Sequence, residues 1–181
     1  MERLARLHPP FDNEDRQRLY AAITSGPRGG SQQPFPLVDD VGALAGPFNA
    51  MLLQPDLGAA LQALGAAIRY QGTLPARIRE LAILVVAGHW SSAFEQHAHE
   101  AAGRRAGLSE EELAAVRAVR ALVQDGDLDD EAYARAVAQL GEAGVFELTT
   151  LVGYYATLAL QLRVFRVGGP EAGAPEASAP G

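Results

Sequence analysis

Apolar residues recur at spacings of three and four along much of this chain, and this periodicity constrains the fold more than any other feature. One such helical face carries Leu57, Leu61, Leu64 and Ile68. Runs that alternate between apolar and polar residues, with hairpin turns between them, do not occur, although residues 34–42 could form a short strand or turn. The sequence therefore predicts an all-α fold, a compact helical bundle.

Capping residues and helix breakers set the predicted boundaries of the helices. Asp12 suits the N-cap of the first helix and Gly26 its end, while Ser109-x-x-Glu112 is a capping box. We expect helices at residues 12–26, 55–70, 75–90, 91–107, 109–126, 129–144 and 143–167. The last of these is apolar on most of its faces, which predicts a central position in the bundle.

Stretches rich in Gly and Pro divide the chain into three parts. Residues 1–46 are expected to hold an N-terminal helix and a Gly/Pro-rich arm, and residues 47–167 the helical domain. Residues 168–181 have few apolar side chains and are expected to be a disordered tail. The connection at residues 26–47 is long for a compact domain, and such loops are usually functional or part of an interface.

Composition excludes several classes of protein. The chain of 181 residues has 22 acidic against 15 basic residues and a net charge of −7, which argues against nucleic acid as a partner. It has no cysteine, so a disulfide framework, a thiol nucleophile and a thiolate metal site are impossible. We expect a cytoplasmic protein with no membrane partner, because the start lacks the apolar core of a signal peptide and no stretch has the character of a membrane span.

Glu80 is the first candidate for chemistry. It lies early on an expected helix whose following residues are aliphatic. A buried carboxylate without a partner has a raised pKa, which is how proteins make a proton-transfer group. The alternative is an ion pair with Arg77, Arg79 or Arg69.

A second group of candidates follows at the break between two expected helices. His89 and Trp90 fall at this break, and Ser92-x-x-Glu95 has the pattern of a capping box. Glu95 and His99 are four residues apart and share one helix face, so the carboxylate could orient the imidazole and raise its pKa for proton transfer. The alternative is that Glu95 only caps its helix and His99 faces solvent.

Metal binding is a weaker reading of the histidines. His97 and His99 are two residues apart and point to nearly opposite sides of a helix, so they cannot share a metal ion. A metal held by His89, Glu95 and His99 stays open as an alternative, which elemental analysis would test.

Three further candidates lie outside this region. Tyr154 and Tyr155 occur in the long apolar helix, where a buried hydroxyl needs a partner, and one of them could face a pocket. Glu147 on the same helix either pairs with an arginine or lies in the first turn. Arg28, within the Gly-rich segment GPRGG, could present its guanidinium to an anion.

Residues 72–118 resemble the core of the carboxymuconolactone decarboxylase family, whose superfamily includes the alkylhydroperoxidase D-like proteins. The matching features are the R-x-R-E-L start, the aliphatic helix, the aromatic–acid–histidine segment and the sequence AGRRAGLSEEE. The segments PRGG, FPLVDD, GPFNAMLLQP and GVFELTTLVGYY are similar to those of the long, cysteine-free members.

This resemblance implies a helical bundle of the alkylhydroperoxidase D-like type, a homo-oligomer such as a trimer or hexamer, and a pocket between helices near the subunit interface. In the peroxidase branch a glutamate precedes C-x-x-C, and a histidine follows four residues after the second cysteine. On this chain the glutamate falls at Glu80, the two cysteines at Ser92 and Glu95, and the histidine at His99. With both thiols replaced, thiol peroxidase chemistry is excluded.

The function that the resemblance implies is a cofactor-independent lyase, or an isomerase, acting by proton transfer on a small carboxylated or lactone-like substrate. No metal or other cofactor is expected. The expected catalytic residues are Glu80, Glu95 and His99, and the expected substrate-binding residues are Arg77, His89, Trp90, Arg28 and Tyr154. The alternative is a catalytically silent helical oligomer that binds a small ligand or a protein partner.

Overall fold

The computed structural model describes residues 3–29, 36–90 and 109–167, and the helices in these ranges pack around one hydrophobic core. Within them, the only β-type pairing is an isolated bridge between Val38 and Leu44. The prediction of an all-α fold is therefore confirmed. The elements are α1 (Glu14–Ser25), the 3₁₀ turn η1 (Pro27–Gly29), α2 (Pro47–Met51), α3 (Pro55–Tyr70), α4 (Ala76–Trp90), α6 (Glu110–Gln124) and α7 (Asp130–Phe165).

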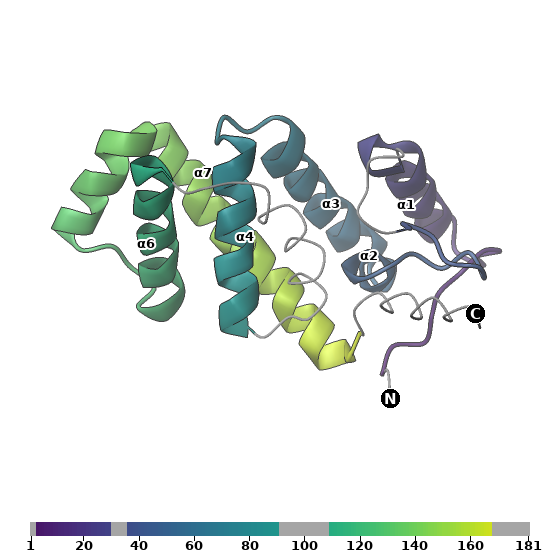
Figure 1. The fold of residues 1–181 in the computed structure, drawn as a ribbon. Coiled ribbons are helices and arrows are strands. Elements are labelled where there is room, and N and C mark those ends of the chain that lie inside the picture. The colour runs from purple at the N-terminus through teal and green to yellow at the C-terminus, as the bar shows by residue number, and fades with distance from the viewer. Residues whose placement is uncertain (1–2, 30–35, 91–108, 168–181) are drawn as a thin grey trace, which may run out of the picture.

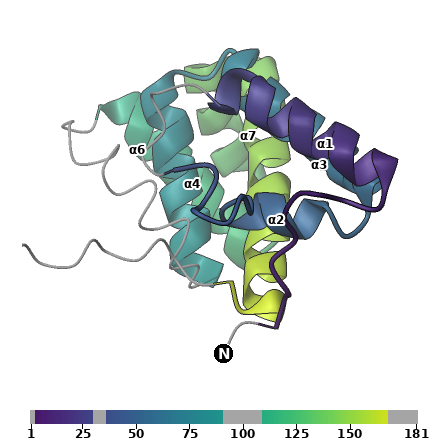
Figure 2. The same ribbon diagram turned by 90° about the vertical axis from the view of Figure 1, so that its right-hand side faces the viewer.

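Helix α7 is the centre of the bundle, as its apolar sequence predicts. It runs diagonally behind α4 and packs against both α4 and α6, while α2 and α3 lie on its other side (Figures 1 and 2). Leu148, Leu151 and Leu158 are buried there. By length and composition alone α7 could cross a membrane, but half of its most apolar window is buried inside the protein, as in the core helix of a bundle.

A kink divides α7 into two helical segments. Gly141 has φ 71° and ψ 166°, a conformation that only glycine adopts without strain. The sequence predicts a shorter helix followed by a long apolar one, and the backbone breaks close to the expected junction. The kink lets the second segment enter the core at its own angle.

The first 46 residues share the core of the helical domain. Leu19 and Ile23 of α1 and Leu44 of the following loop belong to the same buried cluster as α4 and α7. The N-cap of α1 is Asn13 rather than the predicted Asp12, because the Asn13 side chain accepts a hydrogen bond from the Arg16 backbone N–H at 3.0 Å.

The buried face of α3 matches the predicted one only in part. Leu57 and Leu64 are exposed, and the buried residues of the helix are Gly58 and Gly65. A Cβ atom at Gly58 would collide with the Met51 carbonyl, so the glycine allows α2 and α3 to approach closely. Leu61 and Ile68 of the predicted face pack against the core as partly buried side chains, while the two glycines form the buried contacts of the helix.

Glu147 joins α7 to the start of α4. Its carboxylate accepts hydrogen bonds from the Thr73 N–H at 2.7 Å, the Thr73 hydroxyl at 2.6 Å and the Leu74 N–H at 2.9 Å. It is therefore neither in the first turn of its own helix nor in a direct ion pair; it caps the positive end of another helix. Burial acts to raise the pKa of Glu147, but the bonds from Thr73 and Leu74 and the charge of Arg79 outweigh it and lower the pKa.

We expect Glu147→Gln to lower the free energy of unfolding by about 1 kcal/mol at neutral pH, because it removes a charged helix cap. Since the folded-state pKa is lowered, this contribution is present above the unfolded value near 4.5 and disappears as the pH falls through the folded value. Urea unfolding of both proteins between pH 3 and 7 measures the difference. Glu142→Gln, an exposed site on the same helix, is the control and should change little. A difference that persists undiminished at the lowest pH would contradict the capping role.

Candidate functional site

Glu80 is buried on the inner face of α4, with 9% of its surface exposed. Its Oε1 lies 3.4 Å from Nη2 of Arg69 on α3 and 3.9 Å from Nε of Arg79. The ion-pair alternative raised by the sequence is therefore the arrangement that the structure contains, with Arg69 and Arg79 rather than Arg77 as partners. Pairing with a guanidinium favours the charged form of a carboxylate.

Arg69 extends this ion pair to α7. Burial acts to lower the pKa of Arg69, but the nearby Glu80 carboxylate and the hydrogen bond to Tyr155 raise the pKa above its usual value. Arg69 therefore stays cationic. One side chain from each of α3, α4 and α7 meets at this point, so the contact fixes three helices at once.

Arg28 on η1 is a buried cation, with 8% of its surface exposed. Its guanidinium lies 5.0 Å from the centre of the Phe48 ring, a cation–π contact. Its Nε is buried without a hydrogen-bond partner, and no carboxylate pairs with it among the described residues. Burying a charge without a partner lowers the stability of the fold, so this position calls for an explanation.

Arg28 and Tyr154, both expected from the sequence to bind substrate, come together across Gly65 of α3. A Cβ atom at Gly65 would lie 2.9 Å from Nη2 of Arg28 and collide with the Tyr154 hydroxyl. The Tyr154 and Tyr155 rings meet edge to face, with centroids 5.1 Å apart. We call Arg28, Arg69, Glu80, Tyr154 and Tyr155 the buried arginine–tyrosine cluster.

Arg77 is placed elsewhere. Its guanidinium forms an ion pair with Glu112, which is buried at the start of α6. The Glu112 carboxylate also accepts from the Ser109 N–H, and the Glu112 N–H donates to the Ser109 hydroxyl at 3.4 Å, so the predicted capping box is present. The sequence pattern identified the cap but not the ion pair. Arg77 thus ties α4 to α6 through this ion pair, while its Nη2 is buried without a hydrogen-bond partner.

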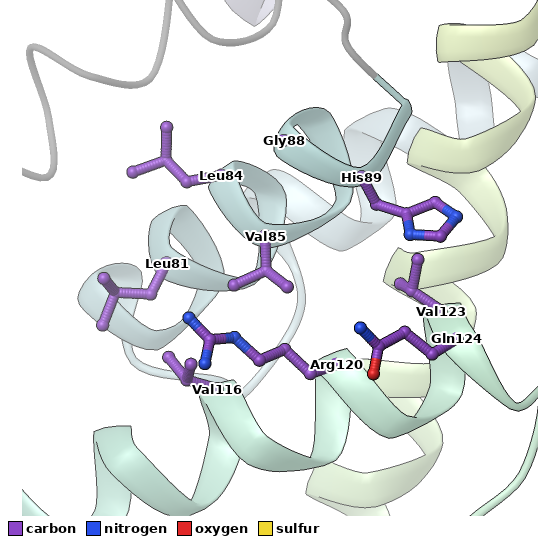
Figure 3. Close-up of a pocket in the computed structure, with 9 residues that line it drawn as sticks. All are labelled: Leu81, Leu84, Val85, Gly88, His89, Val116, Arg120, Val123 and Gln124. Carbon is purple, nitrogen blue, oxygen red and sulfur yellow. The ribbon is translucent and has the colours of Figure 1, made fainter.

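His89 and Trp90 end α4, away from the cluster. His89 lies nine positions after Glu80, which is about 14 Å along a helix axis. The two rings pack at right angles with centroids 5.3 Å apart, and the Trp90 carbonyl accepts a hydrogen bond from Nη1 of Arg163 at 3.0 Å. His89 is exposed and lines a pocket between α4 and α6 (Figure 3).

Glu95 and His99, with Ser92 and His97, lie outside the described residues. Their convergence with Glu80 thus stays a prediction from the sequence. Across residues 3–29, 36–90 and 109–167, no three His, Asp or Glu side chains are grouped so that they could hold a metal ion. The alternative metal site with His89, Glu95 and His99 is not tested by this, because two of its members lie outside.

A comparison of the sequence with models of protein families gives one match. The model of the carboxymuconolactone decarboxylase family matches residues 55–140, which span α3, α4, α6 and the start of α7. The helical region at residues 55–140 therefore belongs to the carboxymuconolactone decarboxylase family. The assignment agrees with the resemblance of residues 72–118, and it covers Arg69, Glu80 and both ends of the Arg77–Glu112 pair. The search of curated proteins gave no match.

Two solved structures have a fold similar to that of this chain. A protein of unknown function from Agrobacterium tumefaciens, proposed to be the antioxidant defence protein AhpD, is 21% identical with a TM-score of 0.59 over 67% of this chain and 96% of that chain. The debrominase Bmp8, as a C82A variant in complex with 2,3,4-tribromopyrrole, is 13% identical with a TM-score of 0.62 over 95% of both chains. At these identities the likeness establishes the fold alone.

We expect Gly65→Ala to lower the free energy of unfolding by about 1–3 kcal/mol, because the added methyl group overpacks the contact between α3 and the Arg28–Tyr154 pair. Gly153→Ala is the matched control. Gly153 is helical and exposed, and nothing lies within 4 Å of a Cβ added there. It should therefore be neutral or gain up to about 1 kcal/mol from helix propensity. Chemical denaturation of the three proteins measures both effects; equal stabilities for the two variants would show that α3 does not pack this closely.

Proposed function

We propose that this protein is a cofactor-independent lyase that acts by proton transfer on a small carboxylated or lactone-like substrate. The family that matches this chain is named after a decarboxylase. Because the chain has no cysteine, thiol redox chemistry is excluded. In place of thiols, this chain has acid–base groups and guanidinium groups.

The observation that carries the proposal is the charge balance of the buried arginine–tyrosine cluster. Two guanidinium groups, those of Arg28 and Arg69, lie in it beside one carboxylate, that of Glu80, and Glu80 is paired with Arg69. Arg28 therefore lacks a counter-charge among the described residues. A substrate carboxylate would supply this charge and would gain a charge-assisted hydrogen bond in a site of low dielectric.

The proposed chemistry needs only positioning, charge and a proton. The bond between the substrate and its carboxyl carbon breaks, and CO₂ leaves. The electron pair delocalises into the conjugated lactone carbonyl as an enolate, and a proton then adds to carbon. The protein must hold the reacting molecule, stabilise the developing negative charge and deliver that proton.

We assign these tasks to the residues that the sequence singled out. Arg28, with Tyr154 beside it, holds the negatively charged substrate. His99, oriented by Glu95, delivers the proton. Glu80 takes part as a charged group fixed by Arg69, since a carboxylate held in an ion pair is a poor proton donor.

The remaining expectations extend the proposal. We propose that the protein works in the cytoplasm as a homo-oligomer, a trimer or hexamer, without nucleic acid or membrane partners. The alternative function is a catalytically silent helical oligomer that binds a small ligand or a protein partner. The enzyme requires Glu95 and His99 to converge on the buried arginine–tyrosine cluster, and the silent oligomer does not.

The test is to incubate the purified protein with γ-carboxymuconolactone and to follow CO₂ release. The wild type should release CO₂, and His99→Ala should lower the turnover number at least about 100-fold, the usual contribution of a general acid. Arg28→Met should raise the Michaelis constant, because it removes the proposed anion contact and keeps an apolar stem. Arg117→Met, an exposed position on α6, is the control for loss of one arginine.

The possible results separate the alternatives. CO₂ release that is unchanged in His99→Ala would remove His99 from the mechanism. If the wild type releases no CO₂ while its circular dichroism shows a folded helical protein, decarboxylation of this substrate is wrong. The candidates would then be another lactone or enol substrate, or the silent oligomer.

A further inference from the structure

Helices α4 and α6 lie side by side and run in the same direction (Figure 3). The Arg77–Glu112 ion pair joins their first turns. Beyond this pair the contacting positions advance by one turn on each helix, so that Leu81 and Val116, and then Val85 and Arg120, line the space between them. The ion pair therefore fixes the separation at one end of a long shared groove.

A pocket of about 590 Å³ opens along this groove. The volume is within the range of small-molecule sites. Five aliphatic side chains form its apolar walls, namely Leu81, Leu84, Val85, Val116 and Val123. Glu80 is not among the lining residues and instead contacts Arg69 of α3, so the pocket is separate from the buried arginine–tyrosine cluster.

Arg120 supplies the charge in this pocket. Its guanidinium extends between the two helices toward Val116, away from their carboxyl ends (Figure 3). This direction matters because the carbonyl groups at a helix C-terminus repel anions. Arg120 makes no hydrogen bond or ion pair with any described residue. A guanidinium whose N–H donors lie beside aliphatic side chains suits a ligand that joins a carboxylate to a hydrocarbon group.

We propose that the α4–α6 pocket is a binding site for an aliphatic monocarboxylate, with the carboxylate on Arg120 and the hydrocarbon against the five aliphatic walls. His89 and Gln124 form the polar end of the pocket. Among the described lining residues the apolar ones are aliphatic, and the one ring is the His89 imidazole at the polar end, which favours a hydrocarbon chain over a ligand that must stack. This proposal does not rest on the lyase reaction, because it uses a different face of α4.

Octanoate is the probe, and octanamide, which has the same hydrocarbon but no charge, is its control. Binding is measured by titration calorimetry and by the fluorescence of Trp90. Trp90 is the one tryptophan of the chain and lies against His89 of the pocket. The wild type should bind octanoate saturably and more tightly than octanamide. Arg120→Gln should weaken octanoate binding about tenfold, the effect of losing one charge-assisted hydrogen bond, and leave octanamide unchanged.

Two further variants keep the test specific. Arg117→Gln removes an exposed arginine of α6 that does not line the pocket, and it should bind octanoate as the wild type does. Val85→Phe fills the pocket and should weaken both probes while circular dichroism confirms the fold. The proposal is wrong if the wild type shows no saturable octanoate binding, if Arg120→Gln binds octanoate as tightly as the wild type, or if Arg117→Gln loses as much affinity as Arg120→Gln.

Discussion

The ion pair between Arg69 and Glu80 is the contact on which the arrangement of α3, α4 and α7 depends. Removing two charges from water is expensive, and their mutual attraction compensates only if the geometry is good and further hydrogen bonds are made. Tyr155 supplies such a bond to Arg69, and Arg79 adds a second cation near the carboxylate. A different pairing of these helices would leave a buried charge alone, so the contact favours one packing of the bundle over others.

The charge of the interior also differs from the charge of the whole chain. The chain as a whole is acidic, with a net charge of −7, yet the buried arginine–tyrosine cluster has more guanidinium groups than carboxylates. Gly65 leaves the room in which Arg28 and Tyr154 meet, and Phe48 holds the Arg28 guanidinium from below by a cation–π contact. The acidic balance of the whole chain therefore does not extend to this cluster, where the guanidinium groups outnumber the carboxylates.

Periodicity and caps predicted most of the fold. The central position of α7, its break and the Ser109 capping box all follow from local patterns, and each is present. The predicted face of α3 was right for Leu61 and Ile68, which pack against the core, and wrong for Leu57 and Leu64. The leucine pattern ignores helices that meet through glycine, and Gly58 and Gly65, seven residues apart on one face, were the available signal. The sequence also predicted Arg28, Tyr154 and Glu80 as residues of the candidate site. Which arginine pairs with which acid depends on distances between helices, and for that reason Arg77 and Glu147 could not be placed.

A double-mutant cycle on Arg69 and Glu80 tests the central claim most directly. The variants are Arg69→Met, Glu80→Gln and the combination, and the measurement is the free energy of unfolding by urea. The account predicts that each single change is destabilising by about 3 kcal/mol, because it removes one partner of a largely buried ion pair. The double variant should lose less than the two changes added together, with a coupling of about 1–3 kcal/mol. Strictly additive losses would contradict the account, since they would mean that the two side chains do not act as a pair.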